Sequence, residues 1–516
     1  MHATRRRATA VVATTVLATP LLLAASPNHG LPSGHDPAKD AAKLSRQLVR
    51  ASSGKDAYRH LQRFQAIADS ADGHRAAGSP GHDASAAYVY QQLRHAGYRV
   101  AYDTFDFVHT ETLAEKLSVV SPTPRDVTIR AMTYTTSTKT GGITAALAAV
   151  PVDATTGCEA ADYSSATFTG KIALIKRGGC SFAIKQEAAG AAGAVGAVIY
   201  NNVDGVLSGT LGDVASGRIS TGGVTQADGE RLAADLAKGD GVTVSFEIRE
   251  FQEPRTTRNV IAETRGGNAA RTVMLGAHLD SVTEGPGIND NGSGSAGLLE
   301  VALELAKTHR TPTNKVRFAW WSAEENGLKG SEAYVAKLDA AQQKQIALYL
   351  NFDMIASPNG AQFVFDGDDS DGGGSGPGPE GSARLERDIT DFLDRTGTPH
   401  EGTDFTGRSD YGPFIDVGIP AGGTDTGAEV IKSPAQAKKF GGEAGIAFDP
   451  CYHSACDTLA NIDMAYFDAN IDVIANAVGT YAYDLRSLTR PVMSAATVGR
   501  TGSVGGLREG HSDATA

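Results

Sequence analysis

The sequence predicts an α/β protein whose main domain is interrupted by a second, β-rich domain. Three observations lead to this fold class. The length of 516 residues exceeds what one hydrophobic core usually organises, so we expect two structured domains. After Thr256 hydrophobic strands alternate with amphipathic helices, whereas residues 126–253 hold short strands separated by glycines. Hydrophobic residues make up 41% and charged residues 21% of the chain, values typical of a globular protein.

The N-terminus has the pattern of an export signal. A basic cluster, Arg5–Arg7, precedes an uncharged and mostly apolar run from Ala8 to Ala25. We expect a signal peptide at residues 1–25, a linker or propeptide at 26–40, and therefore a secreted, extracellular protein. A membrane anchor is the alternative, but the run is short and contains Pro20. No later stretch is apolar enough to span a bilayer, so we expect no membrane contact after cleavage.

The first part of the main domain, residues 41–125, is predicted to begin with two helices. These are "AAKLSRQLVR" from Ala41 and "ASAAYVYQQLRHAGY" from Ala84, which ends near Gly97. The segment between them is interpreted as a Gly, Ser and Pro loop. In the inserted domain, "GKIALIKRGGC" and "GAVGAVIYNN" are predicted strands, with a helix from Ser181 to Ala191 between them.

The second part of the main domain, residues 254–486, repeats strand, loop and helix. The predicted strands are "RTVMLGAHLD", "NKVRFAWWSAEE" and "QIALYLNFDM", and the first is followed by the helix "SGSAGLLEVALELAKT". Each strand ends in acidic side chains. Because ligands of open α/β sheets bind outside the carboxyl ends of the strands, we expect these side chains to meet in one crevice. Residues 487–516 are predicted to form a flexible tail.

The four cysteines favour disulfide bonds. In an exported protein they allow three pairings, and their placement as two local pairs favours Cys158 with Cys180 and Cys451 with Cys456. Free thiols or a metal-binding pair are the alternatives. The net charge of −12 comes without a Lys/Arg stripe, so we expect no nucleic-acid partner.

Several of the candidate site residues are metal-binding types. His278 and Asp280 form an H-x-D pair after a strand, an arrangement in which a carboxylate orients a metal-binding imidazole. Asp290 lies in a glycine-rich turn before a helix, where it could equally be a helix cap. Glu324 and Glu325 are adjacent carboxylates, which are costly to bury unless cations neutralise them.

Two further candidates lie nearer the C-terminus. Asp353 ends a very apolar strand, where an unpaired carboxylate would be expensive to bury, so we expect a cationic partner. His453 lies between Cys451 and Cys456 and would be held rigidly if those cysteines close a small loop.

In this order the motifs resemble the co-catalytic zinc aminopeptidase family of secreted bacterial exopeptidases. The resemblance covers about residues 55–125 and 256–486 and is carried by "GAHLDSV", "GINDNGSG", "SAEENGLKGS", "NFDM", "GRSDYGPF" and "CYHSACDT". It implies a zinc exopeptidase fold, a mixed central sheet flanked by helices. The inserted stretch resembles a protease-associated (PA) domain, a β-rich module found in several peptidase families.

The resemblance also implies roles for individual residues. His278 and Asp353 would bind one Zn²⁺, Glu325 and His453 a second, and Asp290 would bridge the two ions. Glu324 would be the general base, with Asp280 supporting His278.

Other implied roles concern the substrate. Tyr452 would donate a proton to the developing oxyanion, and Arg408 would shape the amine end of the cleft. "GGTDTGAE", around Gly422 and Gly423, resembles a loop that lines the substrate pocket. An accessory Ca²⁺ is possible at the acidic loop from Asp366 to Ser382, although a solvated loop is the simpler interpretation.

The expected activity is hydrolysis of the N-terminal residue from peptides or proteins with free N-termini, by a monomer. A glutaminyl cyclase with one zinc, another exopeptidase of the same fold, and a non-catalytic binding relative are the alternatives. The number of bound zinc ions and the requirement for a free amine distinguish them.

Overall fold

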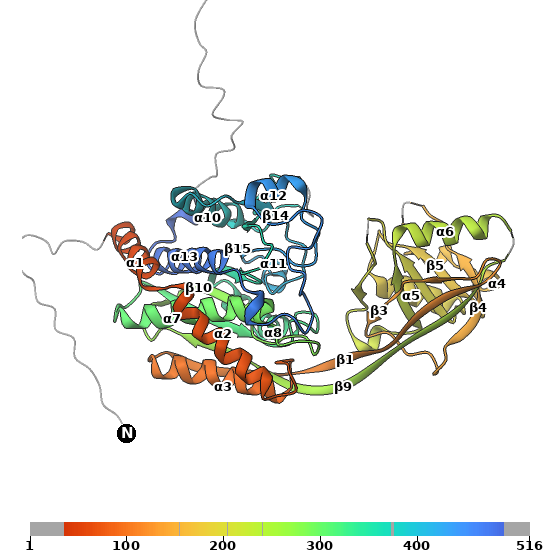
Figure 1. The fold of residues 1–516 in the computed structure, drawn as a ribbon, viewed down its shortest axis with the longest axis horizontal. Helices are drawn as coiled ribbons and strands as arrows, with labels where there is room; N and C mark the ends of the chain where they lie inside the picture. The colour runs from red at the N-terminus through yellow and green to blue at the C-terminus, as the bar shows by residue number, and fades with distance from the viewer. Residues whose placement is uncertain (1–35, 154, 204, 240, 373–375, 490–516) are drawn as a thin grey trace, which may run out of the picture.

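A computed structural model describes residues 36–153, 155–203, 205–239, 241–372 and 376–489. The predicted signal peptide and most of the predicted tail lie outside these ranges. Two bodies are joined by two long antiparallel strands, β1 (Arg99–Ser121) and β9 (Thr243–Glu263) (Figure 1). Their register runs from Arg99 opposite Glu263 to Ser121 opposite Thr243, so the same two strands contribute to both bodies. The predicted domain boundary at 126 follows the end of β1, whereas the boundary at 253 falls inside β9.

Three helices precede β1, where the sequence interpretation expected two. They are α1 (Pro37–Ala51), α2 (Gly54–Asp69) and α3 (Pro80–His95). The prediction of a loop between the two expected helices was wrong over the length of α2. Ala57, Leu61 and Phe64 recur at helical spacing and are fully buried, and Ser53 caps the helix by accepting a hydrogen bond from the Asp56 amide.

The larger body contains a mixed central sheet, which confirms the predicted fold class. Its strand order is β14-β13-β15-β12-β10-β11-β9, and β15, β12, β10 and β11 are mutually parallel. Because the parallel strands share a direction, their carboxyl ends meet at one edge. The bounds are β10 (Asn268–His278), β11 (Asn314–Trp321), β12 (Ile346–Phe352), β13 (Phe363–Phe365), β14 (Glu401–Thr403) and β15 (Ala421–Asp425).

Helices cover both faces of this sheet. The long helices α7 (Gly294–Lys307), α10 (Ser382–Thr396) and α13 (Met464–Tyr481) pack with α2 against one face, and Leu275 and Leu350 lie in that core. On the other face α8 (Lys329–Ala336) and α11 (Gly412–Asp416) pack over Trp321 and Tyr349. Shorter helices are α9 (Ala340–Gln343), α12 (Pro434–Phe440) and the 3-10 turns Leu459–Asn461 and Arg486–Thr489.

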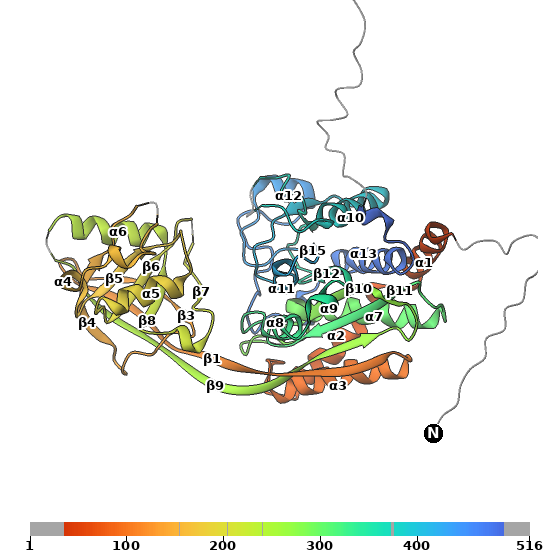
Figure 2. The same cartoon turned by 180° about the vertical axis from the view of Figure 1, so that it is seen from behind.

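The smaller body is the predicted β-rich insertion, seen from both sides in Figures 1 and 2. Its sheet has separate apolar cores on its two faces, one around Phe246 and one around Ile199. The strands are β2 (Arg125–Val127), β3 (Arg130–Thr133), β4 (Ile143–Ala149), β5 (Ile172–Lys176), β6 (Gly196–Tyr200), β7 (Gly209–Thr210) and β8 (Ser220–Val224). The helices are α4 (Ser165–Phe168), α5 (Phe182–Ala191) and α6 (Gln226–Ala237), with 3-10 turns at Ala160–Asp162 and Val214–Ser216.

Both expected disulfides are present, Cys158–Cys180 in the inserted domain and Cys451–Cys456 in the main domain. The local pairing deduced from the cysteine spacing is confirmed. Among the helices within the described ranges, none combines the length and apolar character needed to cross a bilayer.

Candidate active site

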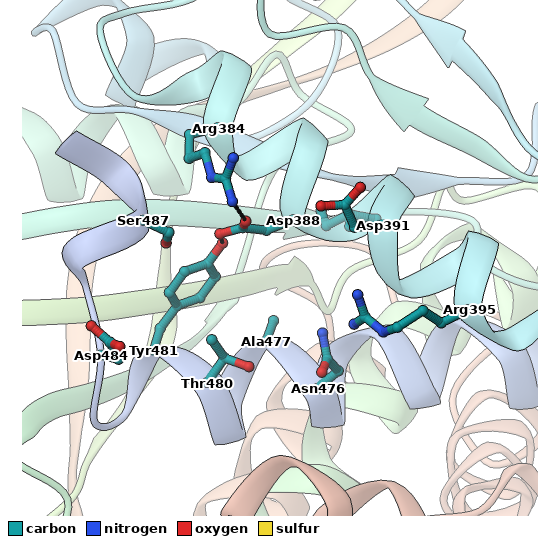
Figure 3. Close-up of a pocket in the computed structure, with 11 residues that line it drawn as sticks. Arg384, Asp388, Asp391, Arg395, Asn476, Ala477, Thr480, Tyr481, Asp484 and Ser487 are labelled. Carbon is teal, nitrogen blue, oxygen red and sulfur yellow. Dashed lines mark hydrogen bonds and ion pairs between the residues drawn. The ribbon is translucent and has the colours of Figure 1, made fainter. Parts of the chain in front are cut away.

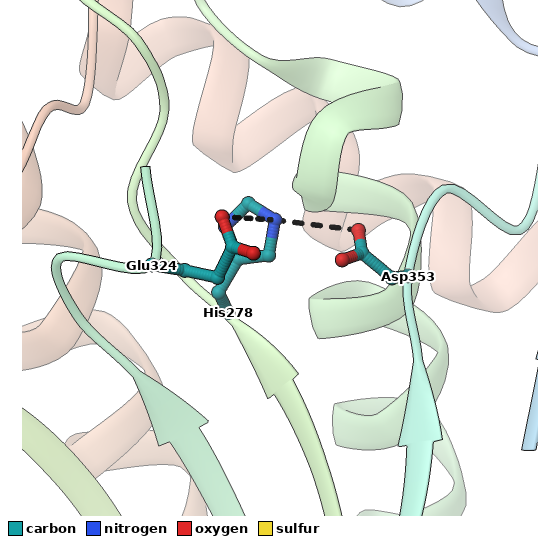
Figure 4. Close-up of side chains that lie close together, drawn as sticks. All are labelled: His278, Glu324 and Asp353. Carbon is teal, nitrogen blue, oxygen red and sulfur yellow. Dashed lines mark ion pairs between the residues drawn. The ribbon is translucent and has the colours of Figure 1, made fainter. Parts of the chain in front are cut away.

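Three candidate site residues follow the carboxyl ends of adjacent parallel strands. His278 is the last residue of β10, Asp353 follows β12, and Glu324 lies three residues after β11 ends at Trp321. Because β10 pairs in parallel with both β11 and β12, these side chains converge at one edge of the sheet (Figure 4). The structure therefore brings together residues that lie up to 75 positions apart in the sequence.

The imidazole of His278 is surrounded by carboxylates. Its Nε2 lies 3.1 Å from Asp290 Oδ1, 3.3 Å from Asp353 Oδ1 and 3.9 Å from Glu324 Oε2. Its Nδ1 faces Asp280, 3.1 Å from the main-chain oxygen and 3.7 Å from Oδ1. The predicted support from Asp280 thus comes more closely from its carbonyl than from its carboxylate, and the Asp280 carboxylate instead accepts a hydrogen bond from the Glu324 amide at 3.3 Å.

Asp290 connects His278 with the second histidine. Its Oδ1 faces His278, while its Oδ2 lies 3.2 Å from His453 Nε2. The same His453 nitrogen lies 2.9 Å from Glu325 Oε2. A single carboxylate with one oxygen directed at each imidazole is the arrangement expected of a group that bridges two cations.

The backbone around Asp290 is held by residues that the sequence interpretation did not single out. Asp290 lies in an irregular turn, Ile288–Ser293, with φ −102° and ψ 95°. The Asn289 and Asp290 amides donate to the two oxygens of Asp457, at 2.8 and 3.0 Å. Asp457 lies within "CYHSACDT", and only its position after Cys456 could have drawn attention to it.

Arg75 is the second missed residue. Its guanidinium is fully buried and donates hydrogen bonds to the carbonyls of Leu279, Pro286 and Gly287. It thereby connects the chain segment after His278 to the turn that carries Asp290. A third missed residue, Ser409, donates to Asp353 Oδ2 at 2.6 Å and fixes that carboxylate. Ser409 lies in the quoted motif "GRSDYGPF", but Arg75 lies in a loop without any such motif.

The electrostatics are those of a buried acidic cluster. Burial raises the pKa of Glu324 well above its usual range and that of Glu325 to about 6. Burial opposes the charge on His453, yet the Glu325 and Asp290 carboxylates raise its pKa to about 11. The imidazoles are therefore acting as the positive partners of these carboxylates, a role that a metal cation would take over.

Tyr452 and Arg408 lie beside the cluster, as the sequence predicts. The Tyr452 ring stacks on His453 with the ring centroids 3.8 Å apart. Arg408 pairs with Glu429 at 2.8 Å, and its Nη2 donates to the Tyr452 hydroxyl at 3.4 Å. Burial raises the pKa of Tyr452 well above its usual value, so the phenol keeps its proton at neutral pH.

The donor set suits a metal ion. Within the described residues, ligand atoms of His278, Glu324 and Asp353 lie within 4.8 Å of one another, as do those of His278, Asp290 and Glu325. Glu325 Oε1 and Asp353 Oδ1 are buried without a hydrogen-bond partner, which is unfavourable unless a cation binds them. Mixed imidazole and carboxylate ligands are typical of zinc.

Two other polar clusters lie elsewhere. Asp366, Asp368 and Glu386 lie close together at the predicted calcium loop, but the Asp366 oxygens already accept hydrogen bonds from the Asp368, Ser370 and Asp371 amides. An accessory Ca²⁺ there stays a prediction. A hollow between α10 and α13 is lined by groups such as Arg384, Asp388 and Tyr481 and by none of the predicted site residues (Figure 3).

Fold and site together define the class of a metal-dependent hydrolase. Comparison with known sequences makes this specific. Peptidase family M28 matches residues 259–478, and the PA domain matches residues 143–232. The chain is 45% identical to the probable leucine aminopeptidase 2 of Trichophyton verrucosum over 85% of this chain and 86% of that protein. It is 44% identical to an aminopeptidase of Pseudomonas aeruginosa, with coverage of 83% and 81%.

Solved structures agree. An aminopeptidase from Aneurinibacillus sp. strain AM-1 superposes with a TM-score of 0.67 at 28% identity, covering 84% of this chain and 95% of that one. A zinc aminopeptidase from Bacillus subtilis gives a TM-score of 0.55 at 26% identity, covering 83% and 94%. The chain belongs to peptidase family M28 and is an aminopeptidase of that family with an inserted PA domain.

Proposed function

We propose that the protein is a secreted aminopeptidase that uses two zinc ions and a glutamate general base to remove the N-terminal residue from peptides. The observation that carries this proposal is the geometry of Asp290, whose two oxygens face different histidines at 3.1 and 3.2 Å. A carboxylate in that position suits a bridge between two ions. A single-zinc site would leave one of these oxygens without a cationic partner.

The local charge also favours two divalent ions. The cluster contains five carboxylates, those of Asp280, Asp290, Glu324, Glu325 and Asp353, and all are buried or half-buried. The guanidinium of Arg75 neutralises one negative charge. The carboxylates still outnumber the cationic side chains at the site, and two divalent cations would neutralise this excess of negative charge.

Five side chains would bind the two zinc ions. His278 and Asp353 would hold one zinc, Glu325 and His453 would hold the other, and Asp290 would contribute to both. When bound, the two ions supply Lewis-acid polarisation of the scissile carbonyl and activation of the attacking water. Ser409 keeps Asp353 oriented, and Arg75 keeps the Asp290 turn in place.

Glu324 is the proposed general base. It lies beside His278 and Asp353, its side chain is 10% exposed, and it is not assigned as a ligand. It takes a proton from the water that attacks the scissile carbonyl and returns it to the nitrogen of the leaving peptide as the C–N bond breaks. The Tyr452 hydroxyl donates a hydrogen bond to the oxyanion that forms meanwhile.

The substrate is a peptide with a free N-terminus. Glu324 and Asp353 provide negative charge for its ammonium group. The positive charge of Arg408 is paired with Glu429, which reduces its repulsion of the ammonium group. Several relatives are named leucine aminopeptidases, so leucine is the first residue to test. Secretion is proposed from the signal pattern, and the two disulfides suit an oxidising compartment.

The test combines zinc content with turnover of a panel of amino-acid amides by wild type and Glu324→Gln. We expect about two zinc ions per chain in both proteins, release only from free amines, and a loss of about 100- to 10,000-fold in kcat for the variant. Glu263→Gln, which removes a carboxylate paired with Arg317 elsewhere on the sheet, is the control and keeps full turnover. One zinc ion with cyclisation of N-terminal glutamine would instead identify a glutaminyl cyclase.

A further inference from the structure

We propose that the inserted domain takes part in catalysis through Tyr134, which positions the chain segment that carries the general base. This segment, residues 323–329, is called the base loop below. The inference rests on the proposed role of Glu324. Tyr134 follows β3, a strand on the side of the inserted domain that faces the main domain in Figure 1. It is a positioning residue, because it touches the base loop and not the reacting atoms.

The base loop is in a strained conformation. Ala323 and Leu328 have φ values of 57° and 63°, in the left-handed region that residues other than glycine rarely adopt. The loop closes on itself through hydrogen bonds from the Gly327 and Leu328 amides to the Glu324 carbonyl, at 2.7 and 2.9 Å. Such a conformation persists only where the surroundings support it, so the contacts around the loop determine where the Glu324 carboxylate lies.

The inserted domain supplies several of these contacts. The Tyr134 hydroxyl donates to the carbonyl of Asn326 at 3.2 Å, two residues after Glu324. The ammonium of Lys329, at the end of the loop, lies 5.5 Å from the centroid of the Tyr134 ring and donates to the Gly212 carbonyl at 3.3 Å. Burial raises the pKa of Tyr134 above its usual value, so the hydroxyl stays a donor.

Tyr134 is itself held firmly. The residue is 3% exposed, and its own φ is 69°. Its amide donates to the carboxylate of Glu250, at 3.0 and 3.3 Å from the two oxygens, and Gln252 also donates to Glu250. Glu250 lies on β9. Further along, β9 pairs with β11, and Val260 of β9 lies opposite Trp320 of β11.

These contacts close a ring through both domains. The base loop follows β11, β11 pairs with β9, β9 presents Glu250, Glu250 fixes Tyr134, and Tyr134 returns to the base loop. Because every link of this ring is a hydrogen bond, a strand pairing or continuous chain, the position of the inserted domain is coupled to the position of Glu324. Loss of the Tyr134 hydroxyl should therefore lower kcat more than it changes KM.

The test compares Tyr134→Phe with Tyr163→Phe in the full-length, zinc-loaded protein. Tyr163 is a matched control, because it is a buried tyrosine of the inserted domain whose hydroxyl donates to the Gly157 carbonyl at 2.8 Å, within that domain. We expect Tyr134→Phe to lower kcat by about five- to tenfold, with a smaller change in KM and with zinc still bound. Amide hydrogen exchange at Gly327 and Leu328 should become faster in Tyr134→Phe alone. Equal kcat and equal exchange in the two variants would overturn the inference.

A second variant tests the same contact without changing Tyr134, so its result does not depend on whether Tyr134→Phe folds correctly. Lys329→Met removes the ammonium from the Tyr134 ring and should also lower kcat and speed exchange in the base loop, by about two- to threefold. Unchanged kcat and exchange in this variant would contradict the inference as well.

A variant in a Glu324→Gln background separates this inference from the proposed function. If Glu324→Gln shows only the low residual turnover expected of it, adding Tyr134→Phe should cause no further loss, because there is no base left to position. A further loss as large as in the wild-type background would refute the positioning role and leave the function standing. If Glu324→Gln alone keeps full turnover, the proposed function is wrong, and the inference falls with it.

Discussion

The substitution Arg75→Lys tests how far the site depends on one buried cation. Arg75 is fully buried and donates to three main-chain carbonyls of the segments that carry His278, Asp280 and Asp290. Burial lowers its pKa to about 10, against the opposing influence of Asp280 and neighbouring carboxylates, so it is charged at neutral pH. A lysine keeps the charge but has one nitrogen, which cannot reach three carbonyls arranged around a planar guanidinium.

The expected loss follows from the groups left without a partner. Two buried carbonyls lose their donor, at about 1–3 kcal/mol each, so we expect Arg75→Lys to lose about 3 kcal/mol of stability. That corresponds to a fall in Tm of roughly 5 °C for the main domain. The loosened turn around Asp290 should also weaken zinc binding by about 10- to 100-fold, the usual cost of losing a group that orients metal ligands.

Thermal unfolding and competition with a chromophoric zinc chelator measure the two effects. Arg317→Lys is the control, because Arg317 is a largely buried arginine on β11 that pairs with Glu263 and Tyr334 rather than with the site. It should lose about 1 kcal/mol and bind zinc like wild type. If Arg75→Lys matched this control in both assays, the reasoning that Arg75 holds the ligand segments would be refuted.

Two further predictions concern the fold. Gly423 has a φ of 135°, and an added Cβ would lie 1.9 Å from the Asn351 carbonyl oxygen, so Gly423→Ala should abolish stable folding in a solubility and circular dichroism assay. Gly418→Ala, also at positive φ but in open space, should cost only about 1 kcal/mol, and equal losses would contradict the steric argument. Glu386 accepts a hydrogen bond from Gly367, and burial raises its pKa to about 7 from an ordinary 4.5. The folded state therefore holds this proton more tightly, stability falls as pH rises from 4.5 to 7, and Glu386→Gln should exceed wild type in urea unfolding at pH 8 but not at pH 4.

The strand-end residues could be predicted from the sequence because hydrophobic strands are recognisable from local composition. The runs before His278 and Asp353 are mostly apolar strands, and the general rule for α/β sheets then places the following polar groups together. The local disulfides were predicted for a similar reason, since Cys451 and Cys456 are only five residues apart.

Other parts of the site depend on contacts that no local pattern encodes. Arg75 lies 204 residues before Leu279, whose carbonyl it binds, and Tyr134 lies 192 residues before Asn326. Neither residue belongs to a periodic element or a metal-binding motif. Helix α2 is a different case, because its apolar spacing was present in the sequence and was overlooked among the flanking glycines and serines.

Backbone strain connects these observations. Ala323 precedes Glu324, Met354 follows Asp353, and His453 is itself a proposed ligand, yet all three have φ values between 47° and 57°. Each such residue costs about 1–3 kcal/mol and is stable only where neighbouring groups determine its conformation.

Each strained position is supported by a contact or a covalent link. The Met354 carbonyl accepts from the Thr426 amide at 3.0 Å, and His453 lies inside the Cys451–Cys456 loop. The base loop, which begins at Ala323, accepts a hydrogen bond from Tyr134 of the inserted domain. Because the supports of Met354 and of the base loop come from distant parts of the chain, a substitution far from the metal ligands can change their geometry. The PA domain is therefore better regarded as part of the frame of the active site than as a separate module attached to it.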